Sequence, residues 1–165
     1  MSAPATNFVI TRMTEHDLLE VVEIEERSGL SRWGWAAYYT ELQGENRDLM
    51  LIARLTSSAA DFGGIAGYVV ARVSANELHI NNVAVREEYR RRGLGLDLLS
   101  RVMEKGKELG ARTAILEVRV GNSAAQALYE KRGFKAIARR SNYYSDPRED
   151  AVVMSLGLDL EKSFS

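Results

Sequence analysis

The residues best suited to anion chemistry form one short run, Arg90-Arg91-Arg92-Gly93-Leu94-Gly95-Leu96. It lies between a predicted strand and a predicted amphipathic helix. The first N–H groups of a helix lack helical partners and carry partial positive charge, and glycines let a phosphate approach the backbone closely. Three guanidinium groups add bidentate donors. The run therefore predicts a phosphate site, and the alternative is a solvated charged stretch before a glycine-rich helix start.

Standard nucleotide and hydrolase motifs do not fit this chain. A dinucleotide fingerprint needs a third glycine where Leu98 stands. A Walker-type loop needs Gly-Lys-Ser/Thr, whereas Gly106-Lys107 continues with Glu108. The segment around Ser123 follows a strand and opens a helix, as a nucleophile elbow would, but both histidines precede that serine and the hydrolase fold needs its histidine after it.

Two residues are candidates for proton transfer. Glu117 lies in an apolar predicted strand, where an unpaired carboxylate would cost several kcal/mol of stability. It is a functional base, an outward-facing residue or the partner of Arg119, which is two residues on and on the same face of the strand. Tyr129 lies on the next predicted helix, where a tyrosine is commonly a core residue with a solvated hydroxyl. The residues alone leave these alternatives open.

The predicted elements that position these residues form an α/β or α+β arrangement, with helices packed on the faces of a sheet. Thr14 is expected to cap the first helix, and Asn122 and Gly133 to begin and end the last one. The expected strands cover residues 8–12, 49–55, 64–73, 77–86, 113–118, 134–140 and 151–156. The other helices cover residues 35–42 and 94–109.

Length and composition limit the possible functions. A chain of 165 residues predicts a single domain, 1–165, with residues 1–7 flexible and 159–165 forming a tail. The chain has no cysteine and only His16 and His79 as histidines, so we expect no disulfide, no thiolate nucleophile and no metal site. A net charge of −1 predicts no general attraction to nucleic acid.

The chain also has no apolar run of membrane-spanning length and no secretory signal at its start, so we expect a cytoplasmic protein without a membrane partner.

The chain resembles the GCN5-related N-acetyltransferases (GNAT). Arg90-x-x-Gly93-x-Gly95 matches their pyrophosphate loop, Gln/Arg-x-x-Gly-x-Gly/Ala. Further matching stretches run in one order from Ile80 to Met154: Asn82-Val83-Ala84-Val85, Leu116-Glu117-Val118-Arg119, Asn122, Ala127-Leu128-Tyr129-Glu130, Gly133-Phe134, Tyr143-Tyr144 and Glu149-Asp150-Ala151. Within this family the chain is most similar to the bacterial ribosomal-protein-alanine acetyltransferases.

The resemblance implies a mixed, mostly antiparallel sheet of six to seven strands flanked by about four helices. It implies acetyl-CoA as co-substrate and no metal. The residues that it assigns to the co-substrate are Val83 and Val85 through their backbone, the loop residues Arg90, Arg91, Arg92, Gly93, Leu94, Gly95 and Leu96, and Asn122. It implies Glu117 as general base and Tyr129 as general acid.

The acceptor implied by the resemblance is a protein N-terminus, with the alanine of a ribosomal protein as the favoured target. Leu30 and Trp33, in the first helix–helix connection, and Tyr143 and Tyr144, in the connection between the last strands, would line its groove. The tyrosine pair could alternatively pack at a strand edge. Lysine or small-molecule amine acetylation, and a non-catalytic acyl-CoA-binding module, are the competing functions.

Overall fold

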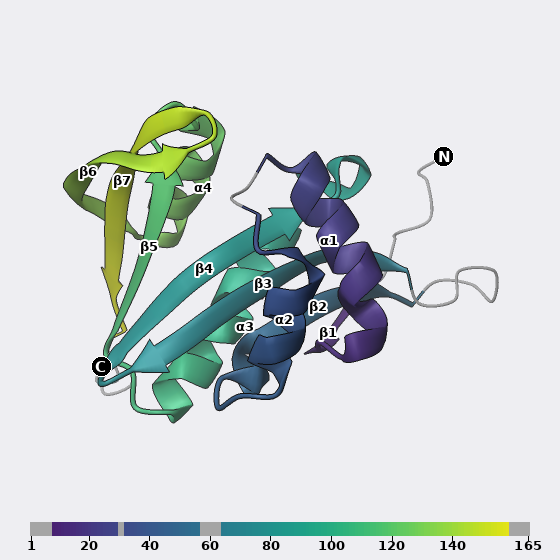
Figure 1. The fold of residues 1–165 in the computed structure, drawn as a ribbon. Coiled ribbons are helices and arrows are strands. Elements are labelled where there is room, and N and C mark those ends of the chain that lie inside the picture. The colour runs from purple at the N-terminus through teal and green to yellow at the C-terminus, as the bar shows by residue number, and fades with distance from the viewer. Residues whose placement is uncertain (1–7, 30–31, 57–63, 159–165) are drawn as a thin grey trace, which may run out of the picture. The chain divides into compact units, whose positions relative to one another are not determined.

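The computed structural model describes residues 8–29, 32–56 and 64–158, and it shows seven strands and four α-helices there (Figure 1). The elements in chain order are β1 (Phe8–Arg12), α1 (Leu18–Arg27), α2 (Gly34–Leu42), β2 (Met50–Leu55), β3 (Ile65–Ser74), β4 (Glu77–Val85), α3 (Leu94–Glu108), β5 (Thr113–Arg119), α4 (Ser123–Arg132), β6 (Lys135–Ser145) and β7 (Arg148–Gly157). The predicted behaviour of residues 1–7 and 159–165 lies outside the described residues.

The strands form one sheet in the order β1-β2-β3-β4-β5-β7-β6. Strands β4 and β5 pair in parallel, whereas the β1–β2, β2–β3, β5–β7 and β6–β7 pairs are antiparallel. This arrangement confirms the predicted fold class, an α/β fold with a mixed and mostly antiparallel sheet.

The chain's contacts group it into two compact units. The first unit comprises the residues up to Val70 together with Asn82–Val102, and the second comprises Ala71–Asn81 together with the residues from Met103 onward. Strands β3 and β4 and helix α3 each contribute residues to both units. The single-domain organisation of residues 1–165 therefore stays a prediction.

In the first unit, α1 and α2 lie on the same side of the strands (Figure 1). Their core-facing residues pack with side chains of β2 and β3 in one buried cluster that includes Leu18, Val21, Ile24, Tyr38, Met50, Ile52 and Tyr68. The cap predicted at Thr14 is confirmed. The Thr14 N–H donates to Asp17 Oδ2 over 2.8 Å, which begins a single 3₁₀ turn before α1.

In the second unit, β5 lies between the first half of β4 and β7, and α4 follows β5. The predicted limits of α4 are confirmed. The Asn122 side chain accepts the Ala125 N–H over 3.0 Å, and Gly133 ends the helix with φ +111°. A left-handed backbone at this position favours glycine because it has no Cβ.

Two predicted boundaries are wrong. The last hairpin is longer than expected, so Tyr143 and Tyr144 lie within β6 and not in a connection. Its chain reversal is at Asp146-Pro147, and Tyr144 pairs with Glu149 across the hairpin. Strand β6 is exposed along almost its whole length, so it shows no apolar alternation to mark it as a strand. Helix α3 ends before Leu109, which is 53% exposed and not on the buried face.

Candidate active site

The arginine-glycine loop, residues 90–96, is built to expose a helix start. Arg91 has φ +66° and Gly93 φ +80°, and α3 begins at the next residue, Leu94. The Asp97 N–H donates to the Gly93 carbonyl over 3.0 Å, the first bond of the helix. The N–H groups that precede it have no helical acceptor, and Arg90, Arg91 and Arg92 are exposed beside them. These donors and charges fit a pyrophosphate group.

The loop is attached to the strand before it. Arg90 Nε donates to the Val85 carbonyl over 2.9 Å, and the Arg92 guanidinium lies 5.7 Å from the centre of the Tyr89 ring. Val83 and Val85 occupy the half-buried face of β4, alternating with the buried Asn82 and Ala84. The structure therefore brings Val85 and Arg90 into direct contact in the first unit.

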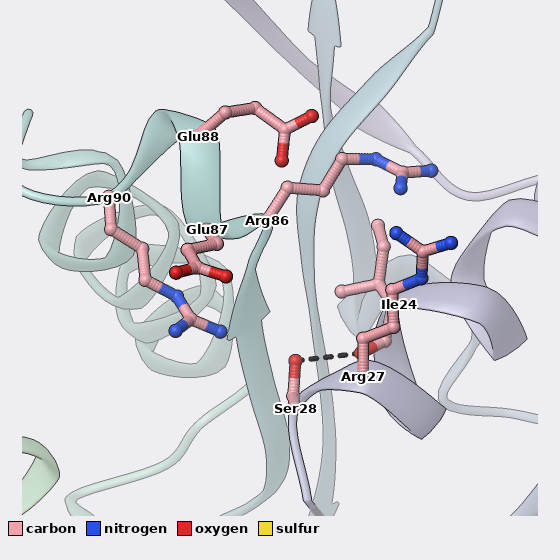
Figure 2. Close-up of a pocket in the computed structure, with 7 residues that line it drawn as sticks. All are labelled: Ile24, Arg27, Ser28, Arg86, Glu87, Glu88 and Arg90. Atoms are coloured by element: carbon pink, nitrogen blue, oxygen red, sulfur yellow. Dashed lines mark hydrogen bonds between the residues drawn. The ribbon is translucent and has the colours of Figure 1, made fainter.

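A pocket of the first unit lies next to Arg90. Residues from the end of α1 and from the segment after β4 face one another across it (Figure 2). The residues that line it are Ile24, Arg27, Ser28, Arg86, Glu87, Glu88 and Arg90. Arg86 is held in this segment by ion pairs with Glu23 and Glu20, at 2.6 and 3.2 Å. Of the residues predicted to bind the co-substrate, Arg90 contributes to this pocket.

Glu117 lies in the second unit, next to a residue that the sequence reasoning missed. Because β4 and β5 are parallel and His79 pairs with Ile115, His79 and Glu117 lie on the same face of neighbouring strands. His79 Nε2 donates to Glu117 Oε1 over 2.6 Å, and the Tyr143 hydroxyl is 3.4 Å from the same oxygen. The alternative ion pair between Glu117 and Arg119 is wrong, because Arg119 pairs with Glu149 at 3.1 Å.

The surroundings of Glu117 set its charge. Burial alone would raise the pKa of this carboxyl, but the hydrogen bond and positive charge of His79, with contributions from Arg140 and Tyr143, hold the pKa below its ordinary value. Glu117 is therefore ionised at neutral pH, with 10% of its side-chain surface exposed. An ionised carboxylate in this state can accept a proton.

His79 is itself oriented from its other side. The Asn81 side-chain nitrogen lies 3.4 Å from His79 Nδ1, and the Asn81 side-chain oxygen is buried without a hydrogen-bond partner among the described residues. Asn81 thus contacts the ring on the side opposite to Glu117, with Nε2 directed at the carboxylate. The sequence does show a histidine, His79, in a strand of alternating burial pattern. It does not show that this strand pairs with the strand of Glu117.

Tyr129 is half-buried in α4, edge-on to Phe134 at 6.0 Å between ring centres. Burial raises the pKa of its phenol to about 12. The hydroxyl therefore keeps its proton at neutral pH and can donate it, as a general acid must. Asn122, at the start of the same helix, is occupied as the helix cap.

The tyrosine pair of β6 lies beside Glu117. The Tyr143 and Tyr144 rings meet edge to face at 5.0 Å, and the guanidinium groups of Arg140 and Arg119 lie over Tyr143 and Tyr144 respectively. Burial is the largest factor that raises the pKa of both phenols, followed by the charge of Glu117 for Tyr143. Tyr143 remains 40% exposed and so is accessible to a ligand.

The other predicted groove residues lie in the first unit or beyond the description. Trp33 is half-buried and its ring stacks on Tyr38 at 5.2 Å. Leu30 lies outside the described residues. The structure thus gathers Glu117, Tyr143 and Tyr144 in the second unit, and the loop, Val83, Val85 and Trp33 belong to the first.

Residues 8–29, 32–56 and 64–158 contain no group of three or more His, Asp or Glu side chains that could hold a metal ion. Within the same ranges, no helix is long and apolar enough to cross a membrane.

Known proteins match most of this chain. The model of the acetyltransferase (GNAT) family matches residues 18–134. A ribosomal protein bS18-alanine N-acetyltransferase of Escherichia coli K12 is 35% identical over 153 residues, which cover 92% of this chain and 98% of that protein.

Two solved structures extend the comparison. The crystal structure of the ribosomal-protein-S18-alanine N-acetyltransferase from Escherichia coli is 32% identical with a TM-score of 0.75, covering 96% of this chain and 99% of that one. A chain of the NatB acetyltransferase complex bound to CoA and MES is 25% identical with a TM-score of 0.77, covering 92% and 99%.

Proposed function

The chain belongs to the GNAT acetyltransferase family and is an N-acetyltransferase with acetyl-CoA as its donor, and we propose that it acetylates the α-amino group of protein N-termini. The observation that carries the acceptor site is the ionised Glu117, held by His79 beside the partly exposed Tyr143. The N-terminal alanine of a ribosomal protein is the first candidate, supported by the substrate for which the relatives are named.

In this proposal the first unit supplies the donor site. The N–H groups at the start of α3 and the guanidinium groups of residues 90–92 hold the pyrophosphate of acetyl-CoA. The backbone of Val83 and Val85 contacts its pantetheine arm, with an N–H near Val83 directed at the thioester carbonyl oxygen. Asn122 contributes from the start of α4. Acetyl-CoA supplies the activated acetyl group, and this chain's residues orient it and handle protons.

Glu117 and Tyr129 handle the protons. Glu117, directly or through water, accepts a proton from the acceptor ammonium so that the free amine can attack the thioester carbon. The new C–N bond forms as the C–S bond breaks, and the nitrogen releases its second proton to solvent. Tyr129 protonates the departing thiolate and regains a proton from solvent. No acyl-enzyme is needed, in keeping with a chain that has no cysteine.

The charge state of the acceptor favours an α-amine. An α-amine with a pKa of about 7.8 is about 2.6 pKa units easier to deprotonate than a lysine of about 10.4, a difference of roughly 3.5 kcal/mol. A carboxylate whose pKa is lowered, as that of Glu117 is, is a weak base and gains most from an acceptor that loses its proton easily. Trp33, Tyr143 and Tyr144 would then contact the first residues of the peptide, as Leu30 would.

We further propose that the chain forms a single domain over residues 1–165 and acts in the cytoplasm. It is proposed to have no nucleic-acid or membrane partner. The location follows from the acceptor, because new ribosomal proteins are made and assembled there.

Mass spectrometry of acetylated peptides tests the acceptor. Short peptides that begin with Ala, Ser or Met are incubated with enzyme and acetyl-CoA beside a matched peptide whose N-terminus is blocked and which carries an internal lysine. We expect the acetyl group on free α-amines, Ala and Ser first. Acetylation mainly of lysine side chains, with free N-termini untouched, would overturn the acceptor while leaving the acetyltransferase activity in place.

A further inference from the structure

A second carboxylate, Glu25 on α1, is the centre of a polar network that the catalytic scheme above does not use. Glu25 is 1% exposed. A buried carboxylate is strongly destabilising unless hydrogen bonds or charges compensate for the lost water. Among the residues that the structure describes, neutral donors reach Glu25, namely the Trp33 and Gly34 N–H groups, the Tyr38 hydroxyl and the Asn82 side-chain amide.

Two of these donors belong to the beginning of α2. The Trp33 N–H donates to Oε2 over 3.0 Å and the Gly34 N–H donates to Oε1 over 3.2 Å, so both carboxylate oxygens are used. The N-cap residue of α2, Trp33, makes no capping hydrogen bond with its own side chain. Glu25 therefore caps α2 from the preceding helix, where the partial positive charge of a helix N-terminus stabilises a negative group.

The Tyr38 side chain extends the network to an aromatic ring. Its hydroxyl donates to Glu25 Oε2, and its ring stacks on Trp33 with centres 5.2 Å apart and planes at 27°. Burial raises the pKa of Tyr38 and of Tyr68, whose hydroxyls lie 3.0 Å apart, so both phenols stay protonated. Trp33 is thus held by its backbone through Glu25 and by its ring through Tyr38.

At its inner end the network reaches β4. The Asn82 side-chain amide donates to the Tyr38 hydroxyl over 2.9 Å and lies 3.4 Å from Glu25 Oε2. Asn82 directly precedes Val83, whose backbone is assigned to the thioester carbonyl. One buried network in the first unit therefore joins the donor-facing strand to the partly exposed Trp33.

We propose that Glu25 is a positioning residue for acetyl transfer, which fixes Trp33 against the acceptor while it holds Asn82, and so the neighbouring Val83, in place. The inference rests on the proposed function, in which Trp33 contacts the acceptor and Val83 the donor. Glu25 itself is buried and touches neither substrate. Its effect is on the geometry in which the two meet.

Glu25→Gln tests this role with almost no change in side-chain shape. The amide nitrogen replaces an acceptor with a donor, so at least one N–H or O–H of the network then faces another donor. We expect the KM of an Ala-starting peptide to rise at least about tenfold, since a displaced residue at a positioned site commonly has effects of that size or more. The shifted Val83 backbone should lower kcat as well, whereas the Kd of acetyl-CoA should stay within about twofold, because the pyrophosphate site at the start of α3 is unchanged.

Two further variants separate positioning from simple folding. Glu26→Gln, at the exposed next position on α1, is the matched control and should leave both constants unchanged. Tyr38→Phe keeps the ring against Trp33 but removes the hydroxyl, and we expect a smaller rise in peptide KM, about threefold to fivefold. In a Trp35→Phe background, Trp33 is the chain's single tryptophan, and its fluorescence emission should shift in Glu25→Gln but not in Glu26→Gln.

The outcomes are distinct. An unchanged peptide KM in folded Glu25→Gln, or an equal loss of peptide and acetyl-CoA affinity, overturns the proposal. If Glu25→Gln does not fold, an unchanged peptide KM and Trp33 emission in Tyr38→Phe overturn it instead. Should the wild-type enzyme acetylate only lysine peptides, the proposed acceptor is wrong, and the same KM comparison is made with the lysine peptide, so the two failures remain separate.

Discussion

At the scale of single residues, the proposed role of Glu117 in accepting a proton depends on how its carboxylate is kept ionised. Burial favours the neutral acid, and the 2.6 Å hydrogen bond from His79 opposes it. The outcome is a carboxylate with a lowered pKa, which is ionised at neutral pH and is a weak base. This balance suits an acceptor amine that already loses its proton near neutral pH.

Glu117→Gln should lower kcat/KM for an α-amine peptide by about 10²- to 10⁴-fold at neutral pH, because the amide has a similar shape and cannot accept a proton. The loss should shrink as the pH rises, since the free amine then accumulates without help. A pH–rate profile from pH 6 to 9 and the Kd of acetyl-CoA measure this. A mutant profile parallel to that of the wild type would contradict the base role.

His79→Ala should raise the pKa of Glu117, because burial then acts without the opposing hydrogen bond and charge. The acidic limb of the kcat/KM profile should move to higher pH. The same pair also affects the free energy of unfolding. Because the pKa of Glu117 is lowered in the folded state, the stability from this pair is present above the unfolded-state pKa of about 4.3. It is lost as the pH falls through the folded-state pKa.

His16→Ala is the matched control for this change, since His16 is the chain's other histidine and is exposed. It should leave the acidic limb where it is. An unmoved limb in His79→Ala would show that His79 does not set the charge of Glu117.

At the scale of elements, the start of α3 and the pairing of β3 with β4 shape the first unit around the proposed donor site. The loop before α3 uses left-handed backbone at Arg91 and Gly93, so the helix begins abruptly at Leu94. In β3, a Cβ on Gly67 would lie 2.6 Å from the Ala84 carbonyl oxygen and 3.2 Å from Val85 Cα. Gly93 thus permits the left-handed backbone, and Gly67 permits a close approach of backbone that a side chain would prevent.

Gly95→Glu should weaken acetyl-CoA binding far more than it weakens folding. Its carboxylate would repel the pyrophosphate at the positive end of α3 and fill the space that the phosphates need. Isothermal titration combined with thermal melting measures both effects. Unchanged affinity in the folded mutant would contradict the assignment of the loop.

Gly67→Ala should destabilise the protein by about 1–3 kcal/mol, because the contact is with backbone atoms that cannot rotate away. Gly64→Ala, where the new methyl would meet only a Leu55 side-chain carbon at 3.5 Å, is the control and should change stability by less than about 0.5 kcal/mol. Urea unfolding compares the two. Equal stability of the two variants would show that β3 and β4 can separate at little cost.

At the scale of the whole molecule, the loop and the two proposed catalytic residues, Glu117 and Tyr129, belong to different units that share β3, β4 and α3. A ligand that binds only the folded chain, as acetyl-CoA is expected to do, stabilises the folded state by mass action. Acetyl-CoA at about 100 times its Kd should add about 2.7 kcal/mol to the free energy of unfolding. For a chain of this size, that corresponds to a rise in Tm of roughly 5–10 °C.

Differential scanning fluorimetry measures this rise. Acetyl-pantetheine, which carries the thioester without the pyrophosphate, is the comparison ligand and at the same concentration should raise the Tm much less. If both ligands raise the Tm equally, the phosphates do not contribute to binding and the loop has another role.

Features encoded in short stretches could be predicted from the sequence alone. The glycines and arginines of residues 90–96, the caps at Thr14 and Asn122, and the stop at Gly133 act through neighbouring backbone, so their meaning is local. The family resemblance in the second half of the chain added the mixed sheet and acetyl-CoA. Exposed β6 was misjudged at its end because alternation marks only strands with a buried face.

The tertiary structure alone decided which distant side chains meet. His79 and Glu117 are 38 positions apart and are joined by the parallel register of β4 and β5, which no local pattern specifies. Glu25 and Asn82 are 57 positions apart and meet because α1 packs over the strands of the first unit. A polar residue inside an apolar segment shows that a partner must exist, but only packing and strand register determine which residue the partner is.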